Sequence, residues 1–155
     1  MRHHFGSIGL VLAVLITLSL GSPAVAQVTV PHMEHCTGTL TEVTASTLFF
    51  AGIGNATHFG KYSIVGSNDF DALGNVLDGE FTTTAADGST ISGVYKGIYA
   101  QTLTGQIRFD VHVKWLEGTG RLAGVTGEAD VVAILDGIEA GDAFEYVTMG
   151  TLTFP

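Results

Sequence analysis

The sequence lacks several features that stabilise or shape other folds, namely disulfides, prolines in turns and amphipathic helices. Cys36 is the only cysteine in 155 residues, so the chain cannot form an internal disulfide and its core must hold the fold by packing. The chain has only three prolines and none between Pro31 and Pro155, which leaves the turns to glycine. After the first 26 residues no segment repeats apolar residues at the spacing of an amphipathic helix, so helices are not expected.

Basic residues are also scarce. Six Lys and Arg stand against 15 Asp and Glu, which gives a formal net charge of −9 at pH 7. Proteins that bind phosphate groups usually carry a basic stripe, and this sequence has none. We therefore expect neither nucleic acid nor an anionic lipid surface as a partner.

The first 26 residues have the order of a secretory signal. A basic start is followed by an apolar run from Ile8 to Leu20 and by small residues at Ala24 and Ala26. The run is shorter than the roughly 18 residues of a membrane-spanning helix, although a retained anchor is the alternative. We predict a signal peptide at 1–26, a flexible N-terminal segment at 27–36 and a barrel domain at 37–155. The cleaved protein would be secreted or periplasmic and free of the membrane.

Apolar and polar residues alternate with a period of two along most of the remaining chain. The pattern is clearest at 107–115, where every second residue is apolar, as is typical of a strand with one buried face. Glycine accounts for 21 of 155 residues, about twice its usual share of roughly 7%. Because glycine lets strands bend and coil, these observations predict an all-β fold with a single eight-stranded antiparallel β-barrel. The expected strands lie near 37–44, 46–52, 55–66, 79–85, 90–100, 105–116, 123–135 and 143–153.

The segment 118–127 (GTGRLAGVTG) begins with a formal match to the dinucleotide fingerprint G-x-G-x-x-G/A. That fingerprint needs a helix directly after the glycines, because the pyrophosphate sits on the N-terminus of the helix. Here two more glycines and then β-branched residues follow Ala123, which disfavours a helix. We therefore expect no dinucleotide or other cofactor. The glycines are interpreted as a structural turn, formed by Gly118, Gly120, Gly124 and Gly127.

The same segment resembles a known family. A strand, a glycine-rich turn and a G-V-x-G run leading into another strand look like the allene oxide cyclase and dirigent-like barrels and their bacterial secreted relatives. The likeness extends upstream over 87–97 (DGSTISGVYKG) and downstream to Phe144, Tyr146 and Gly150, and it covers about residues 79–153. In one departure from the pattern, Leu122 stands where an aromatic residue is commoner.

This resemblance implies an eight-stranded antiparallel barrel with a mostly apolar lumen, often trimeric in plants. Members of the family cyclise hydrophobic small molecules or guide their coupling. The catalytic Glu and Asn of the cyclases have no counterpart between Thr37 and Asn68, so the resemblance carries no catalytic residue over to this chain.

Two segments contain side chains that can ligate metals. Residues 31–36 (PHMEHC) place imidazoles, a carboxylate and a thiol close together, but His32 and His35 have helical spacing in a segment without a helical pattern. Residues 69–80 nearly spell a calcium loop, but Leu73 stands at the fifth position and cannot ligate. We expect a solvated N-terminal segment with an inert thiol, an acidic hairpin connection and no bound metal. A metal-dependent module is an alternative.

Two further patterns concern the faces of strands. Arg108, Asp110, His112 and Lys114 share one face, which we interpret as the solvent side because four buried charges would each need a partner. The run 131–135 (VVAIL) is apolar on both faces, so one face needs cover, and this favours a homo-oligomer.

Two function hypotheses follow. In the first, a secreted barrel without catalytic activity binds a small hydrophobic ligand in its lumen, or serves as a stable extracytoplasmic domain. For each candidate ligand-binding residue the alternative is plain core packing; the candidates are Tyr95, Tyr99, Phe109, Val111, Trp115 and Tyr146. In the second, an allene oxide cyclase-like isomerase or cyclase acts on a hydrophobic substrate in the barrel. The second hypothesis requires an open cavity with an ionisable group of shifted pKa, for which Glu80 and Glu145 are the candidates.

Overall fold

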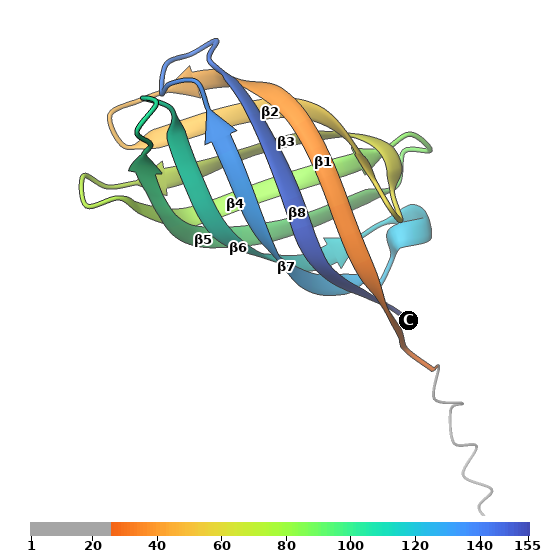
Figure 1. The fold of residues 1–155 in the computed structure, drawn as a ribbon. Helices are drawn as coiled ribbons and strands as arrows, with labels where there is room; N and C mark the ends of the chain where they lie inside the picture. The colour runs from red at the N-terminus through yellow and green to blue at the C-terminus, as the bar shows by residue number, and fades with distance from the viewer. Residues whose placement is uncertain (1–25) are drawn as a thin grey trace, which may run out of the picture.

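The computed structural model describes residues 26–155, which form a closed barrel of eight antiparallel strands (Figure 1). Each strand pairs with the next one along the chain, and β8 returns to pair with β1. The predicted all-β barrel is therefore confirmed. The predicted signal peptide lies outside the described residues, apart from Ala26. The elements are β1 (Val28–Val43), β2 (Thr47–Ala56), β3 (Gly60–Phe70), β4 (Asn75–Ala85), β5 (Thr90–Gln101), β6 (Ile107–Gly118), the 3₁₀ turn η1 (Gly120–Leu122), β7 (Thr126–Leu135) and β8 (Ala143–Phe154).

The long strand β1 closes the barrel. It pairs with β2 on one side and with β8 on the other, where the register runs from Val28 opposite Phe154 to Thr39 opposite Ala143. The prediction of a flexible segment at 27–36 was wrong, because almost all of that segment forms the first part of β1. Its partner strand β8 lies at the opposite end of the chain, so a local pattern gives no sign of the pairing. Closure leaves no strand edge exposed in the described barrel.

The expected boundaries around the third strand also needed correction. The stretch predicted as one strand over 55–66 contains the turn between β2 and β3, and β3 then continues to Phe70. The acidic connection is therefore short. Asp71 Oδ1 accepts hydrogen bonds from the backbone N–H of Leu73 (2.9 Å) and of Asn75 (3.0 Å), so this carboxylate caps its own turn. Within residues 26–155, no group of three or more His, Cys, Asp or Glu side chains is arranged to hold a metal ion.

The chain reverses between β6 and β7 through η1. Gly120 and Gly124 have φ angles of +59° and +76°, which other residues rarely adopt. In the described part of the chain, the three residues of η1 are the only helical element, and no helix there is long and apolar enough to cross a membrane. A single turn that leads directly into β7 does not provide the helix that a dinucleotide fingerprint requires.

Arg121 ties η1 to the neighbouring turns at this end of the barrel. Its guanidinium donates to the backbone oxygens of His58 (2.8 Å) and Phe59 (2.7 Å) and to Asp87 Oδ2 (2.6 Å). These contacts join η1, the β2–β3 turn and the β4–β5 turn. The Phe59 ring is thereby held inside the barrel, where it is almost fully buried.

Inward-facing glycines make room for aromatic rings from other strands. A Cβ atom at Gly54 would lie 2.5 Å from both Cζ and Oη of Tyr62, and one at Gly66 would lie 2.5 Å from the Phe50 ring. Any larger residue at these positions must therefore displace the neighbouring ring. Small barrels commonly alternate small and large inward residues in this way. The same relation holds at Gly38, Gly79 and Gly93.

The interior of the barrel is filled at one end and hollow at the other. The filled end carries η1, the C-terminal end of β8 and the turns after β2 and β4 (Figure 1). Its interior is packed by fully buried side chains, namely Phe59, Ile91, Leu122, Val125 and Leu152. Toward the other end a cavity of about 100 Å³ remains, and inward-facing residues of all eight strands line it.

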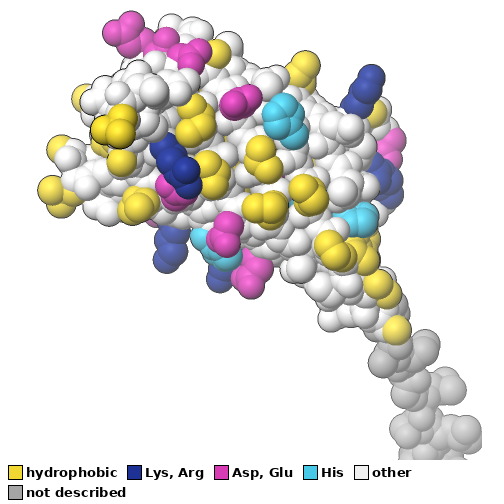
Figure 2. Space-filling model, in the orientation of Figure 1, with side chains coloured by type: hydrophobic (Ala, Val, Ile, Leu, Met, Phe, Trp, Pro, Cys, Tyr) yellow, Lys and Arg dark blue, Asp and Glu magenta, His cyan; other side chains and the backbone are white. Residues whose placement is uncertain are grey.

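The outer surface separates charged from apolar positions. On β6, Arg108 pairs with Asp110 (2.6 Å) and His112 contacts Asp130 of β7 (2.9 Å), so the predicted charged stripe does face solvent. Outward positions of β7, β8 and β1 instead hold exposed apolar side chains, and Figure 2 shows hydrophobic side chains spread over this face. They include Met33, Val132, Val147 and Met149. In the run 131–135, three side chains point into the barrel and the other two point outward.

Candidate functional site

Five of the six residues predicted to line the lumen do line the cavity: Tyr95, Phe109, Val111, Trp115 and Tyr146. Tyr99 is the exception. Its ring stacks on Phe109 at a centroid distance of 5.4 Å, and its hydroxyl donates to the backbone oxygen of Asp71 (2.6 Å). Tyr99 therefore holds the β3–β4 turn instead of facing the cavity.

The lumen contains a carboxylate, but it does not belong to either of the two residues that were the candidates. Glu80 and Glu145 were the candidates, and both are exposed on the outer face, so that prediction was wrong. Each stands next to an inward-facing aromatic residue, and alternation along a strand turns it outward. The carboxylate inside the barrel belongs to Glu34 of β1, which is only 6% exposed and lines the cavity.

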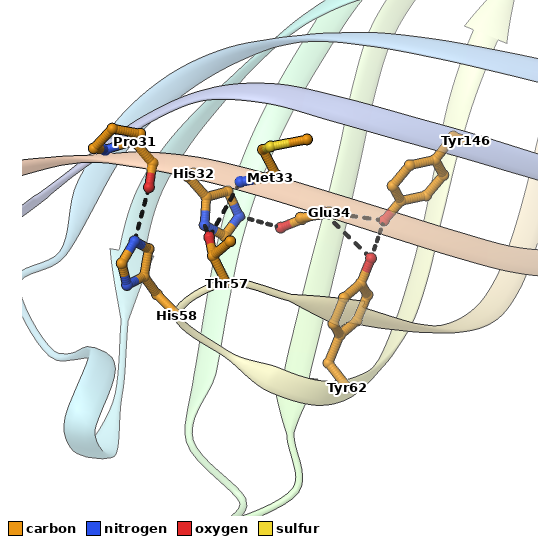
Figure 3. Close-up of polar contacts among 8 residues, drawn as sticks. All are labelled: Pro31, His32, Met33, Glu34, Thr57, His58, Tyr62 and Tyr146. Carbon is orange, nitrogen blue, oxygen red and sulfur yellow. Dashed lines mark hydrogen bonds and ion pairs between the residues drawn. The ribbon is translucent and has the colours of Figure 1, made fainter.

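Three side chains of β1 bring this chemistry into the lumen. His32, Glu34 and Cys36 point inward at successive alternate positions, while Met33 and His35 point outward. Figure 3 shows His32 and Glu34 on one side of β1 and Met33 on the other. His32 is 1% exposed and Cys36 is fully buried. The sequence predicts a solvated segment here, so the most polar part of the lumen is not among the predicted site residues.

Glu34 is the centre of a buried hydrogen-bond network drawn in Figure 3. Its Oε1 lies 2.7 Å from Nε2 of His32. Its Oε2 accepts from the hydroxyl groups of Tyr62 (3.3 Å) and Tyr146 (3.4 Å), which also lie 3.0 Å from each other. The residues come from β1, β3 and β8, which barrel closure brings together. Such partners are what a buried carboxylate needs to offset its loss of hydration.

His32 is held in place from several sides. Its Nδ1 lies 3.3 Å from Thr57 Oγ1, and this hydroxyl oxygen accepts from the backbone N–H of Met33 (3.2 Å). The imidazole ring contacts the Trp115 ring edge to face, at a centroid distance of 5.1 Å, and also packs against Phe59. The Thr57 hydroxyl can donate to Nδ1, which leaves the Nε2 proton for Glu34.

The hydroxyl and thiol groups around Glu34 keep their protons. Burial, together with the Glu34 charge, raises the pKa of Tyr62 and Tyr146 well above the ordinary value for tyrosine. Burial also raises the pKa of the Cys36 thiol to about 11. At neutral pH the two phenols are therefore hydrogen-bond donors. Cys36 is an unreactive thiol, because the thiolate is the nucleophile.

A second polar pair in the lumen is hydrogen-bonded within the protein. The Tyr95 hydroxyl donates to Asn68 Oδ1 (2.9 Å), and Asn68 Nδ2 donates to the backbone oxygen of Asp69 (3.0 Å). Burial raises the pKa of Tyr95 as well, so this phenol also stays protonated. The pair links two strands and uses the Tyr95 proton and one of the two N–H groups of Asn68.

Two other polar groups of the cavity wall have no partner. Nε1 of Trp115 and Oγ1 of Thr148 are buried and make no hydrogen bond, although both residues line the cavity. Thr148 pairs directly with Glu34 across the β1–β8 ladder, and the Trp115 ring contacts His32. Both residues therefore lie beside the Glu34 network, at the inner end of the cavity.

The site thus combines apolar walls with one polar end. At that end the cavity wall includes the carboxylate of Glu34, the protonated phenol of Tyr146, the indole of Trp115 and the hydroxyl of Thr148, and the phenol of Tyr62 is bonded to Glu34. No lysine or arginine is among the residues that line the cavity. Such an arrangement can orient a small molecule by its polar end and can pass a proton between the Glu34 carboxylate and a bound molecule.

Comparisons with family models, with curated proteins and with solved structures found no match to this chain.

Proposed function

We propose that the protein is exported and that its barrel binds a small, largely apolar molecule in the lumen. The observation that carries this proposal is the cavity of about 100 Å³ bounded mainly by apolar side chains. Eight-stranded barrels are usually just wide enough for side chains to fill, so unfilled space in one half of the barrel needs a reason. An apolar protein cavity of about 150 Å³ binds benzene, so the ligand expected here is of ring size or slightly smaller.

Native mass spectrometry of the protein purified from its own host tests the proposal. The wild-type protein should retain a small molecule that is released on unfolding. The variant Ala133→Phe adds a ring to the cavity wall and should lose that molecule. Val132→Phe, one residue away on the outer face, is the matched control and should retain it. An empty wild-type barrel, or equal retention by Ala133→Phe, would overturn the proposal.

The Glu34 network favours a second candidate function, an isomerase or cyclase that acts on a hydrophobic substrate. This candidate also agrees with the resemblance to allene oxide cyclase and dirigent-like barrels. A buried carboxylate beside two protonated phenols can accept a proton from a bound molecule and return it at another atom, which leaves the composition unchanged. Confinement of a flexible substrate in the lumen would supply part of the rate enhancement.

The variant Glu34→Gln separates the two candidates. It keeps the shape of the side chain but removes the group that exchanges protons. For a binding protein, the wild type and the variant should release the same molecule. For an isomerase, the two should release molecules of equal mass that separate on chromatography, because the variant retains unconverted substrate. Identical molecules from both proteins would refute the proposal that the protein is an isomerase or cyclase.

Export is supported by the order of basic, apolar and small residues in 1–26. Cleavage after Ala26 would remove the signal and leave the whole of β1 in place, because that strand begins at Val28. The intact mass of the protein from its host should therefore correspond to a chain that starts at Gln27. A mass that includes residues 1–26 would contradict this expectation.

A further inference from the structure

The two unpartnered groups of the cavity indicate which polar group a ligand should carry. Trp115 and Thr148 are 2% and 1% exposed, so neither Nε1 nor Oγ1 can reach bulk water. A buried polar group without a hydrogen bond is costly, and each instance in a folded protein needs an explanation. The indole N–H can only donate, so its missing partner must be an acceptor. The threonine hydroxyl can donate to an acceptor or accept from a donor.

The charge of the site limits the ligand further. Glu34 lies across the β1–β8 ladder from Thr148, and no lysine or arginine lines the cavity. His32, which also faces this network, is already hydrogen-bonded to Glu34 and Thr57. A ligand carboxylate would therefore meet a like charge in a buried site without a cation to offset it. Fatty acids and other organic anions are excluded on this basis.

We infer that the lumen accepts a compact, neutral, largely apolar molecule with an acceptor oxygen such as a carbonyl group, and that Trp115 and Thr148 bind this oxygen. The inference rests on the proposed function and names the ligand chemistry of the same cavity. The apolar walls hold the body of the ligand, while the polar end beside Glu34 fixes its direction.

Three matched probes test this chemistry on the barrel of residues 27–155. Cyclopentanone has the carbonyl, cyclopentane lacks it, and cyclobutanecarboxylate replaces it with a charge. Trp115 is the only tryptophan of the chain, so its indole N–H gives one unambiguous NMR signal. Cyclopentanone should bind saturably and shift this signal downfield. Cyclopentane should bind about fivefold to tenfold more weakly, since it leaves the donors unpaired. The carboxylate should not bind.

Two variants test whether Trp115 and Thr148 bind the carbonyl oxygen of cyclopentanone. Trp115→Phe keeps an aromatic ring and removes the N–H, and Thr148→Val keeps the shape and removes the hydroxyl. Each variant should weaken the binding of cyclopentanone about fivefold and leave the binding of cyclopentane unchanged. If Trp115→Phe does not fold, Thr148→Val alone carries the test.

The outcomes separate this inference from the proposed function. If cyclopentane binds as well as cyclopentanone and the indole signal does not move, ligand binding stands but the inferred chemistry is wrong, and buried water is the partner of Trp115. Binding of cyclobutanecarboxylate at the strength of cyclopentanone would also overturn the inference. If the protein from its host is empty, the proposed function itself fails.

Discussion

Replacement of Gly54 by alanine tests whether the glycines of this barrel exist to seat aromatic rings. The added Cβ would lie 2.5 Å from Cζ and Oη of Tyr62 and 2.6 Å from the backbone oxygen of His35. Contacts this close do not persist, so the Tyr62 ring has to move within a packed interior. Its hydroxyl would then leave Glu34, from which it is now 3.3 Å away.

The expected loss of stability has two parts. Overpacking of a well-packed core costs about 1–3 kcal/mol. Removal of one donor from the buried Glu34 carboxylate costs about 1–3 kcal/mol more. Together, Gly54→Ala should lower the free energy of unfolding by about 2–6 kcal/mol. A domain of this size has a total stability of about 5–15 kcal/mol, so urea denaturation followed by circular dichroism can resolve the change.

A double-mutant cycle identifies the cause. Tyr62→Leu removes the ring, so Gly54→Ala should cost at least about 1 kcal/mol less in that background than in the wild type. The contact with the His35 backbone is unaffected by Tyr62 and sets the residual cost. Gly88→Ala is the control: a Cβ there meets nothing within 4 Å, so only its φ of +84° is strained. Additive free energies in the Gly54/Tyr62 cycle would refute the reasoning.

Three further predictions concern ionisation and assembly. Folding raises the Cys36 pKa from 9.0 to about 11, so the stability linked to the protonated thiol is complete below pH 9 and is lost as the pH rises through about 11. Over this range the free energy of unfolding in urea should fall by about 2–3 kcal/mol more in the wild type than in Cys36→Ala. Equal falls in both proteins would contradict the prediction. Hydrogen bonds from Ser89 and Arg121 lower the pKa of Asp87, so the stability that this carboxylate contributes is present above its unfolded pKa of 3.8 and is lost at lower pH. In an acid titration followed by circular dichroism, Arg121→Met should lose less stability than the wild type. An equal loss of stability in both proteins would refute this prediction. The exposed apolar face of β7 and β8 predicts that the protein sediments as an oligomer and that Val132→Lys dissociates this oligomer. A wild-type protein that sediments as a monomer would contradict the prediction.

The sequence predicts the barrel well because two local signals agree. Alternation over 107–115 identifies the inward face of β6, and every residue of that strand predicted to point inward is at least partly buried. The glycines that bend the strands also stand where rings enter the lumen. These properties depend on a residue and its close neighbours, so a single sequence can reveal them.

The polar end of the lumen was not predictable in the same way. The inward residues of β1 include His32, Glu34 and Cys36, so a rule that seeks apolar residues at alternate positions misses the strand. Only the pairing with β8 assigns those residues to the inside of the barrel. Whether side chains fill the lumen depends on packing among eight strands, which no local pattern records.

The most direct test of the central claim is a crystal structure of the protein from its own host at atomic resolution, with attention to the space between Glu34, Trp115 and Thr148. The account predicts an unfilled volume of about 100 Å³ in the protein packing. Ligand density should occupy this volume, with an acceptor atom within hydrogen-bond distance of Trp115 Nε1. A lumen filled by side chains, with Trp115 Nε1 bonded to another protein group, would contradict it.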